Sequence, residues 1–85
     1  MNGDQMKDRV GSPMSGGGPN PDKAMWPELV GVPATPTVMK IMQDRPDVAV
    51  EVLPPGSAVV PGFNSKRVRV FVDENSLVQQ TPTIG

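Results

Sequence analysis

The run Leu53-Pro-Pro-Gly-Ser-Ala-Val-Val-Pro-Gly-Phe-Asn-Ser-Lys66 determines how the rest of the chain is interpreted. It lies between two runs that are typical of buried strands, residues 48–53 and residues 67–72. Its middle has too few polar turn-forming residues for an ordinary hairpin tip, and it shows no helical period. A compact domain that keeps so long and apolar a segment outside regular structure usually does so for a function. The sequence therefore predicts a loop that is displayed to another protein.

The two flanking runs alternate in the way expected of strands with one covered face. Valines occupy every second position of residues 48–53, and Glu51 falls on the opposite face. Residues 67–72 alternate more sharply, because their valines share one face while Arg67, Arg69 and Phe71 share the other. β-Branched residues at this period favour a sheet with one buried side. Both runs are therefore predicted to be strands.

A short helix is expected before the first strand, over residues 36–44 or 36–45. Thr35 is the predicted N-cap and Pro36 the first helical residue, where a missing N–H costs nothing. The Arg45-Pro46 pair predicts the helix end, since the residue before a proline is pushed out of the α region. A helix this short needs to dock on the sheet. The residues expected to pack around the helix and the sheet are Trp26, Leu29, Val38, Ile41 and Met42, with Met39 as a further gap-filler.

A turn at residues 73–76 and short closing strand segments at 77–78 and 81–85 complete the pattern. The sequence thus predicts an α+β domain, in which one α-helix packs on a small mixed β-sheet with an extended, exposed loop. Residues 1–22 hold too few apolar groups to offset the backbone entropy lost on ordering. They are predicted to form a disordered tail, and residues 23–85 are predicted to form the domain.

Composition limits the class of function. With 85 residues one domain is the ceiling, and without cysteine there is no disulfide framework, thiol nucleophile or thiolate metal site. A net charge of −1, with acids and bases interspersed, argues against nucleic acid or a membrane as partner. There is no histidine, and the serines have no base partner at a recognisable spacing, so an enzyme is the weakest functional class. No catalytic residue, cofactor or metal site is expected.

The sequence also gives an expectation about location. No stretch approaches the apolar length that a membrane span requires. Residues 1–25 lack the apolar run of about seven residues that marks a secretory signal. The segment is therefore expected to be cytosolic, or else exported by a route that the sequence does not show.

Five motifs at fixed separations point to one family. In chain order they are Trp26-Pro-Glu-Leu-Val-Gly31, Gln43-Asp-Arg-Pro46, Val52-Leu-Pro-Pro-Gly-Ser57, Arg67-Val-Arg-Val-Phe-Val-Asp73 and Gln80-Thr-Pro-Thr-Ile-Gly85. Together they strongly resemble the potato inhibitor I family, which includes barley chymotrypsin inhibitor, eglin and the wound-induced inhibitors of cereals. The resemblance covers residues 25–85 without an obvious gap.

This resemblance implies a substrate-like inhibitor of serine proteases, whose loop at residues 56–66 enters a subtilisin-like or chymotrypsin-like active site in extended form. In the family the strands beside the loop lie parallel, and two arginines under the loop stiffen it without disulfides. By loop length the reactive bond corresponds to Pro61–Gly62, and the loop-supporting arginines correspond to Arg67 and Arg69. The protease-contacting residues that the resemblance implies are Ser57, Ala58, Val59, Val60, Phe63 and Asn64.

The residues at the reactive bond depart from the family pattern. Pro61 has no N–H to give to a protease, and its ring is short and fixed. Val60 replaces a threonine hydroxyl and Gly62 replaces a carboxylate, so each supporting arginine is expected to lose its partner. The residues alone leave open whether Arg67 and Arg69 reach under the loop or form a solvated sheet face. Gly62 also adds backbone freedom, which the fixed φ of Pro61 offsets in part.

The sequence leaves two functions open. The first is a monomeric protease inhibitor of weakened or unusual specificity, directed at a subtilisin-like or elastase/chymotrypsin-like serine protease. The small residue at the reactive position argues against trypsin, which needs a long cation, and against chymotrypsin, which prefers a large ring. The alternative is a non-inhibitory member of the fold that serves as an interaction or storage protein.

Overall fold

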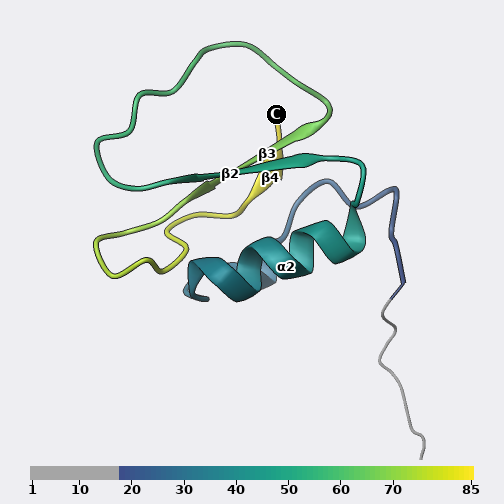
Figure 1. Ribbon diagram of the computed structural model, residues 1–85, viewed down its shortest axis with the longest axis horizontal. Coiled ribbons are helices and arrows are strands. Elements are labelled where there is room, and N and C mark those ends of the chain that lie inside the picture. Colours follow the sequence, from purple (N-terminus) through teal and green to yellow (C-terminus); the bar gives the residue numbers. More distant parts are fainter. Residues whose placement is uncertain (1–17) are drawn as a thin grey trace, which may run out of the picture.

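The computed structural model describes residues 18–85, and the part of the predicted tail at residues 1–17 lies outside this range. Within the described range one α-helix lies along one side of a small sheet, and a long loop arches away on the other side (Figure 1). In chain order the elements are the 3-10 turn η2 (Pro27–Leu29), the helix α2 (Ala34–Asp44) and the strands β2 (Ala49–Leu53), β3 (Arg67–Phe71) and β4 (Thr83–Ile84). The predicted α+β class, one helix on a small mixed sheet, is confirmed.

The sheet has the strand order β2-β3-β4, with β3 in the centre. β2 and β3 run parallel, so that Val50 lies opposite Val68 and Leu53 lies opposite Phe71. β4 pairs with β3 in the antiparallel sense. Parallel neighbours need a long connection, because the chain must return to the end of the sheet from which it started. Residues 54–66 form this connection, so the topology itself requires a long segment where the apolar run lies.

The core lies between the helix and the covered face of the sheet. Val68 and Val70 are fully buried on β3, as the alternation of this strand predicted. Trp26 is fully buried and Leu29 is 8% exposed, which confirms their predicted packing. The alternation of β2 holds less well, since Val52 is 40% exposed on an edge strand at the end that leads into the loop.

Helix α2 begins two residues before the predicted start, and the prediction of Thr35 as N-cap is wrong. Pro33 is the residue that precedes the helix, and Thr37 Oγ1 donates a hydrogen bond to its carbonyl oxygen at 2.9 Å. Thr35 already lies in the first turn. Pro36 fits there as well, because the first N–H groups of any helix lack an intrahelical partner. The predicted end of the helix is confirmed.

The buried face of α2 is not the apolar stripe that the sequence predicted. Ile41 and Asp44 are buried, whereas Met42 is 51% exposed and Met39 is 67% exposed. The two methionines are therefore not gap-fillers of the core, and that prediction is wrong. Asp44 is tolerated inside because its Oδ2 accepts a hydrogen bond from the indole Nε1 of Trp26 at 2.9 Å. The spacing of apolar residues could not identify this buried face, because the face contains a hydrogen-bonded carboxylate.

The closing part of the chain is less regular than expected. Only β4 forms strand pairs, while Val78 makes an isolated bridge with Val72. The predicted turn at residues 73–76 is present, and Asp73 Oδ1 accepts the backbone N–H of Asn75 at 2.8 Å. This turn brings the chain back beside β3, so that β4 completes the sheet.

Candidate reactive loop

The loop between β2 and β3 starts with a tight turn. The N–H of Ser57 donates to the carbonyl oxygen of Pro54 at 3.1 Å, and Ser57 Oγ donates to the same oxygen at 2.7 Å. Gly56 has a φ of +82°, which a residue with a side chain adopts only under strain. A proline followed by a glycine with positive φ is the signature of a type II turn, and Pro55-Gly56 supplies both. The turn fixes the direction in which the chain leaves β2.

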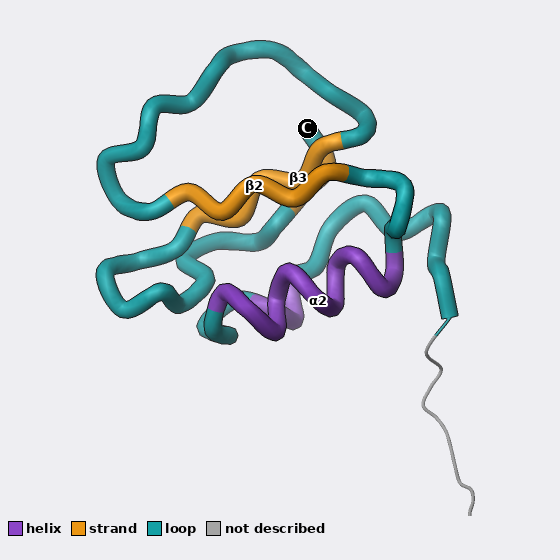
Figure 2. Tube along the Cα trace, in the orientation of Figure 1, coloured by secondary structure: helices purple, strands orange, loops and turns teal. Residues whose placement is uncertain are grey.

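Beyond this turn the chain arches away from the sheet on the side opposite α2, without regular structure (Figure 2). Its large apolar side chains face water, with Val60 69% exposed and Phe63 77% exposed. Pro61 and Gly62 between them are exposed as well. All eight residues from Ser57 to Asn64 that the sequence assigned to the reactive bond and to protease contact lie in this loop. The loop thus presents an apolar tip that the domain does not bury.

Two arginines on β3 hold the carbonyl groups on either side of Pro61. Arg69 Nη2 donates to the carbonyl oxygen of Val60, and Arg67 Nη2 donates to the carbonyl oxygen of Gly62 at 2.7 Å. The expectation that each arginine loses its partner is therefore wrong, because the main chain of the substituted residue takes the place of the missing side chain. Between them, the carbonyl of Pro61 has no hydrogen-bond partner among residues 18–85.

Arg67 also connects the loop to the last described residue. Its Nη2 and Nε lie 2.6 Å and 3.2 Å from the main-chain oxygen of Gly85. The N–H of Asn64 donates to the same oxygen at 3.0 Å. The main-chain oxygen of Gly85 therefore accepts from three donor atoms. It links the second half of the loop to the residue that follows β4. This contact could not be predicted from the sequence, because nothing in the local pattern around Gly85 marks its main-chain oxygen as an acceptor.

Arg69 is less completely satisfied than Arg67. Glu51 is its neighbour across the parallel pair, and the Glu51 Oε1 lies 3.6 Å from Arg69 Nε. This distance is too long for a hydrogen bond, and the buried Nε atom has no hydrogen-bond partner in the described structure. Arg69 and Glu51 therefore interact mainly through the attraction of their charges. Water weakens this attraction, because the Glu51 side chain is half exposed.

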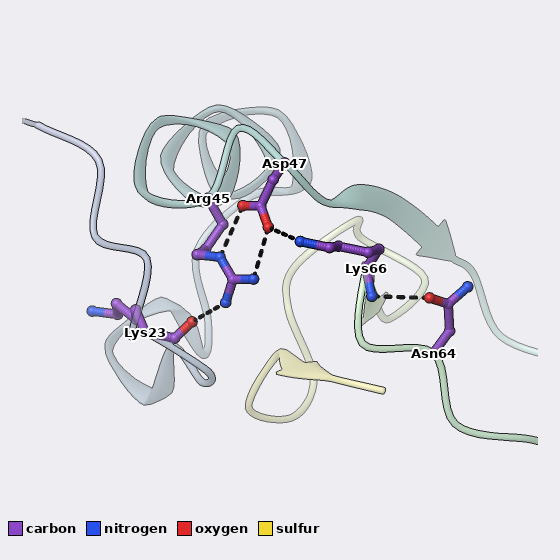
Figure 3. A network of polar contacts seen from close by, with 5 residues as sticks. All are labelled: Lys23, Arg45, Asp47, Asn64 and Lys66. Atoms are coloured by element: carbon purple, nitrogen blue, oxygen red, sulfur yellow. Dashed lines mark hydrogen bonds and ion pairs between the residues drawn. The ribbon is translucent and has the colours of Figure 1, made fainter.

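A network of ion pairs lies where the chain returns from the loop to β3 (Figure 3). The carboxylate of Asp47 accepts from Arg45 through Nε and Nη2, both at 2.9 Å, and from Lys66 Nζ at 2.7 Å. Arg45 Nη1 donates to the carbonyl of Lys23 at 2.9 Å, and the N–H of Lys66 donates to Asn64 Oδ1 at 2.9 Å. These hydrogen bonds, first from Arg45 and then from Lys66, hold the pKa of Asp47 far below its ordinary value.

The sequence did not predict the network around Asp47. Its members come from the segment before the helix, the end of the helix and the end of the loop, so no local pattern joins them. Asp47 is 40% exposed and Lys66 is 64% exposed, so the network remains in contact with water. Its effect is to tie the last residues of the loop to the body of the domain.

Gly62 has a φ of +113°, in the region that favours glycine. An added Cβ would meet no atom within 4 Å, so a side chain at residue 62 would fit in the available space. The reason for a glycine at this position is therefore the backbone conformation. The chain bends at residue 62, directly after Pro61, and a side chain at this positive φ would strain the backbone.

No cluster of potential metal ligands and no pocket is found within residues 18–85. Small-molecule and catalytic sites are concave, whereas exposed Val60 and Phe63 lie on a loop that arches away from the sheet. The arrangement suits a segment that is bound by another protein.

Comparison with known proteins places this loop in a family. Residues 16–85 match the family model of the Potato inhibitor I family. The chain belongs to the potato inhibitor I family. The resemblance drawn from the five motifs is thereby confirmed, and the relatives of the chain are protease inhibitors, not enzymes.

Several members of the potato inhibitor I family show the extent of the similarity. Subtilisin inhibitor 1 from Phaseolus angularis is 48% identical over 65 residues, which cover 76% of this chain and 71% of the relative. Subtilisin inhibitor CLSI-I from Canavalia lineata is 46% identical over 63 residues, which cover 74% of this chain and 95% of the relative. The crystal structure of bitter gourd trypsin inhibitor superposes on this chain with a TM-score of 0.71 and 36% sequence identity. The matched region covers 74% of this chain and 93% of the bitter gourd inhibitor chain.

The helix of this family member is also short in relation to a lipid bilayer. None of the helices within residues 18–85 is long and apolar enough to cross a membrane.

Proposed function

We propose that the protein inhibits serine proteases by inserting the loop at residues 56–66 into the active site as a substrate would, with Pro61–Gly62 as the reactive bond. One observation carries the proposal. The carbonyl groups of Val60 and Gly62 are held by Arg69 and Arg67, and the carbonyl of Pro61 between them is left without a partner. A substrate-like inhibitor needs this division, because only the carbonyl at the reactive bond has to face the catalytic groups.

The supporting contacts explain how such a loop resists cleavage. A loop that is already held in its bound shape loses little conformational entropy on binding, so its contact energy appears as affinity. Arg67 and Arg69 reach the loop on both sides of the proposed bond, and a cut would leave each new end attached to β3. Ser57, Ala58, Val59, Val60, Phe63 and Asn64 are the proposed contact residues on either side.

The names of several relatives support a class of target. The names of the relatives from Phaseolus angularis and Canavalia lineata refer to subtilisin, and a relative from Hordeum vulgare is named a subtilisin-chymotrypsin inhibitor. We infer a target among enzymes of this general class, bound by one monomer of the inhibitor. The short ring of Pro61 favours an enzyme with a small or tolerant primary pocket, such as a subtilisin-like or elastase-like protease. No comparison favours the alternative, a non-inhibitory interaction or storage protein.

An inhibition panel tests the proposal. The wild-type protein and the variant Pro61→Met are titrated against subtilisin, elastase, chymotrypsin and trypsin, and competitive inhibition constants are measured. We expect wild-type inhibition of subtilisin or elastase, little inhibition of trypsin, and tighter inhibition of subtilisin and chymotrypsin by Pro61→Met, which restores the N–H and a long apolar side chain. If both proteins leave all four enzymes fully active, the proposed function is wrong.

A further inference from the structure

Pro61 is the loop residue that a subtilisin-type target explains least. In a substrate-like complex the residue on the acyl side of the reactive bond donates its N–H to the enzyme. Proline has no N–H, so an enzyme that is built to receive this bond keeps an unpaired acceptor in a desolvated cleft. Such a defect weakens binding by about 10- to 100-fold. The loop carries this defect at the position where it should be best adapted.

The surroundings of Pro61 leave its ring as the main feature that an enzyme would contact. The residue is exposed, and the carbonyl groups of both neighbours point to the arginines. Gly62 adds no side chain beside the ring, and the space around its Cα is open. Val60 and Phe63 stand on either side with exposed fractions of 69% and 77%. The loop therefore presents one short ring with a free carbonyl, framed by two apolar side chains.

We propose that the target is a serine endopeptidase whose primary pocket accepts proline and that cleaves on the carboxyl side of proline in intact proteins. This inference rests on the proposed function and deepens it by naming the target class. An enzyme whose normal substrates have proline at this position cannot use an N–H there, so Pro61 costs it nothing. Its pocket is shaped for the pyrrolidine ring, which turns the apparent defect into the basis of specificity.

The test compares two enzymes and two substitutions. The wild-type protein is titrated against subtilisin and against a proline-specific serine endopeptidase that digests intact proteins. We expect inhibition of the proline-specific enzyme to be at least about tenfold tighter, from the N–H argument alone. Pro61→Ala restores the N–H and removes the ring. It should weaken inhibition of the proline-specific enzyme by about tenfold and strengthen inhibition of subtilisin by a similar factor.

Pro55→Ala is the matched control, because it also removes a loop proline but lies in the turn at the start of the loop. Pro55→Ala should weaken inhibition of both enzymes by the same factor, so that the ratio of the two inhibition constants is unchanged. Thermal unfolding of each variant verifies that the domain remains folded. A wild-type protein that does not inhibit the proline-specific enzyme overturns the inference, and so does a Pro61→Ala variant that shifts both constants in one direction.

The failure of this inference differs from the failure of the proposed function. If subtilisin is inhibited and the proline-specific enzyme is not, the protein is an inhibitor with a different target. If neither enzyme is inhibited by the wild-type protein, by Pro61→Ala or by Pro61→Met, the proposal that the loop acts on serine proteases is wrong as well.

Discussion

Main-chain carbonyl groups replace side chains as the acceptors under this loop. The alternation of residues 67–72 placed Arg67 and Arg69 on one strand face, and the structure brings both under the loop. The acceptors were not predictable, because the sequence specifies which side chain is lost at Val60 and Gly62 but not where their carbonyl groups point. A carbonyl oxygen is an adequate acceptor for a guanidinium, so each arginine keeps a contact with the loop through a neutral main-chain acceptor.

Substitution of either arginine tests these contacts. Arg67→Ala and Arg69→Ala should each weaken inhibition about tenfold, because a hydrogen bond to a charged group contributes about 1.5–3 kcal/mol and exposure to water reduces that value. The cleavage rate of the loop should rise in parallel. Lys40→Ala is the control, since it removes a half-exposed cation of α2 that lies far from the loop in sequence and whose ion pair with Asp44 spans 3.4 Å. Inhibition by Arg69→Ala that matches the wild type would contradict the proposed support.

The positive φ of Gly62 leads to a second prediction at the residue scale. Gly62→Ala should lower the free energy of unfolding by about 1 kcal/mol, because a side chain at positive φ strains the backbone. Gly56→Ala should cost a similar amount, since Gly56 also has a positive φ and open space around its Cα. Only Gly62→Ala should also weaken inhibition strongly, because it bends the chain at the proposed bond. Equal loss of inhibition in both variants would show that residue 62 has no special place. Urea unfolding and inhibition titrations provide both readouts.

At the scale of the elements, periodicity predicted the strands well and the helix only in part. The alternating valines of β3 are buried, because β3 is the central strand and α2 lies along only one side of the sheet. Helix α2 differs because its covered face contains Asp44, which pairs with the Trp26 indole. That pairing joins residues 18 positions apart, so neither the rotation of the helix nor its earlier start could be deduced from local apolar spacing.

The helix face can be tested with adjacent residues. Ile41→Ala should destabilise the domain by about 2–4 kcal/mol, because it leaves a cavity in the core. Met42→Ala should change stability by less than about 0.5 kcal/mol, because this side chain is more than half exposed. The measurement is the free energy of unfolding from urea titrations. Similar costs for the two substitutions would contradict the orientation of α2.

At the scale of the whole molecule, the fold and the site depend on each other through the parallel pairing of β2 and β3. The α+β class was predictable from the elements, and the parallel pairing was implied by the family resemblance. The Asp47 network was not predictable, because it joins the segment before the helix, the helix end and the loop end through side chains that are distant in sequence (Figure 3). It holds the loop end against the domain without a disulfide.

The network gives the domain a pH dependence with a definite sign. Because the pKa of Asp47 is lower in the folded state, the carboxylate stabilises the fold above its ordinary pKa of about 3.9, and this stability is lost as the pH falls below that value. Asp47→Asn cannot lose a charge on acidification. The urea midpoint should therefore fall less between pH 7 and pH 3 in Asp47→Asn than in the wild type. An identical fall in both proteins would show that the network does not contribute. The hydrogen bond from Lys23 also lowers the pKa of Glu28, but Glu28 contributes the same pH dependence to the wild type and to Asp47→Asn.

The most direct test of the central claim is to map the bond that a protease cuts in the loop. The protein is incubated with a catalytic amount of subtilisin or of the proline-specific endopeptidase, whichever it inhibits more tightly, and the products are identified by intact-mass spectrometry. We predict slow cleavage at the single bond Pro61–Gly62, with the two fragments remaining associated through the paired strands β2 and β3. Cleavage at another loop bond, or rapid degradation of the domain without inhibition, would contradict the account.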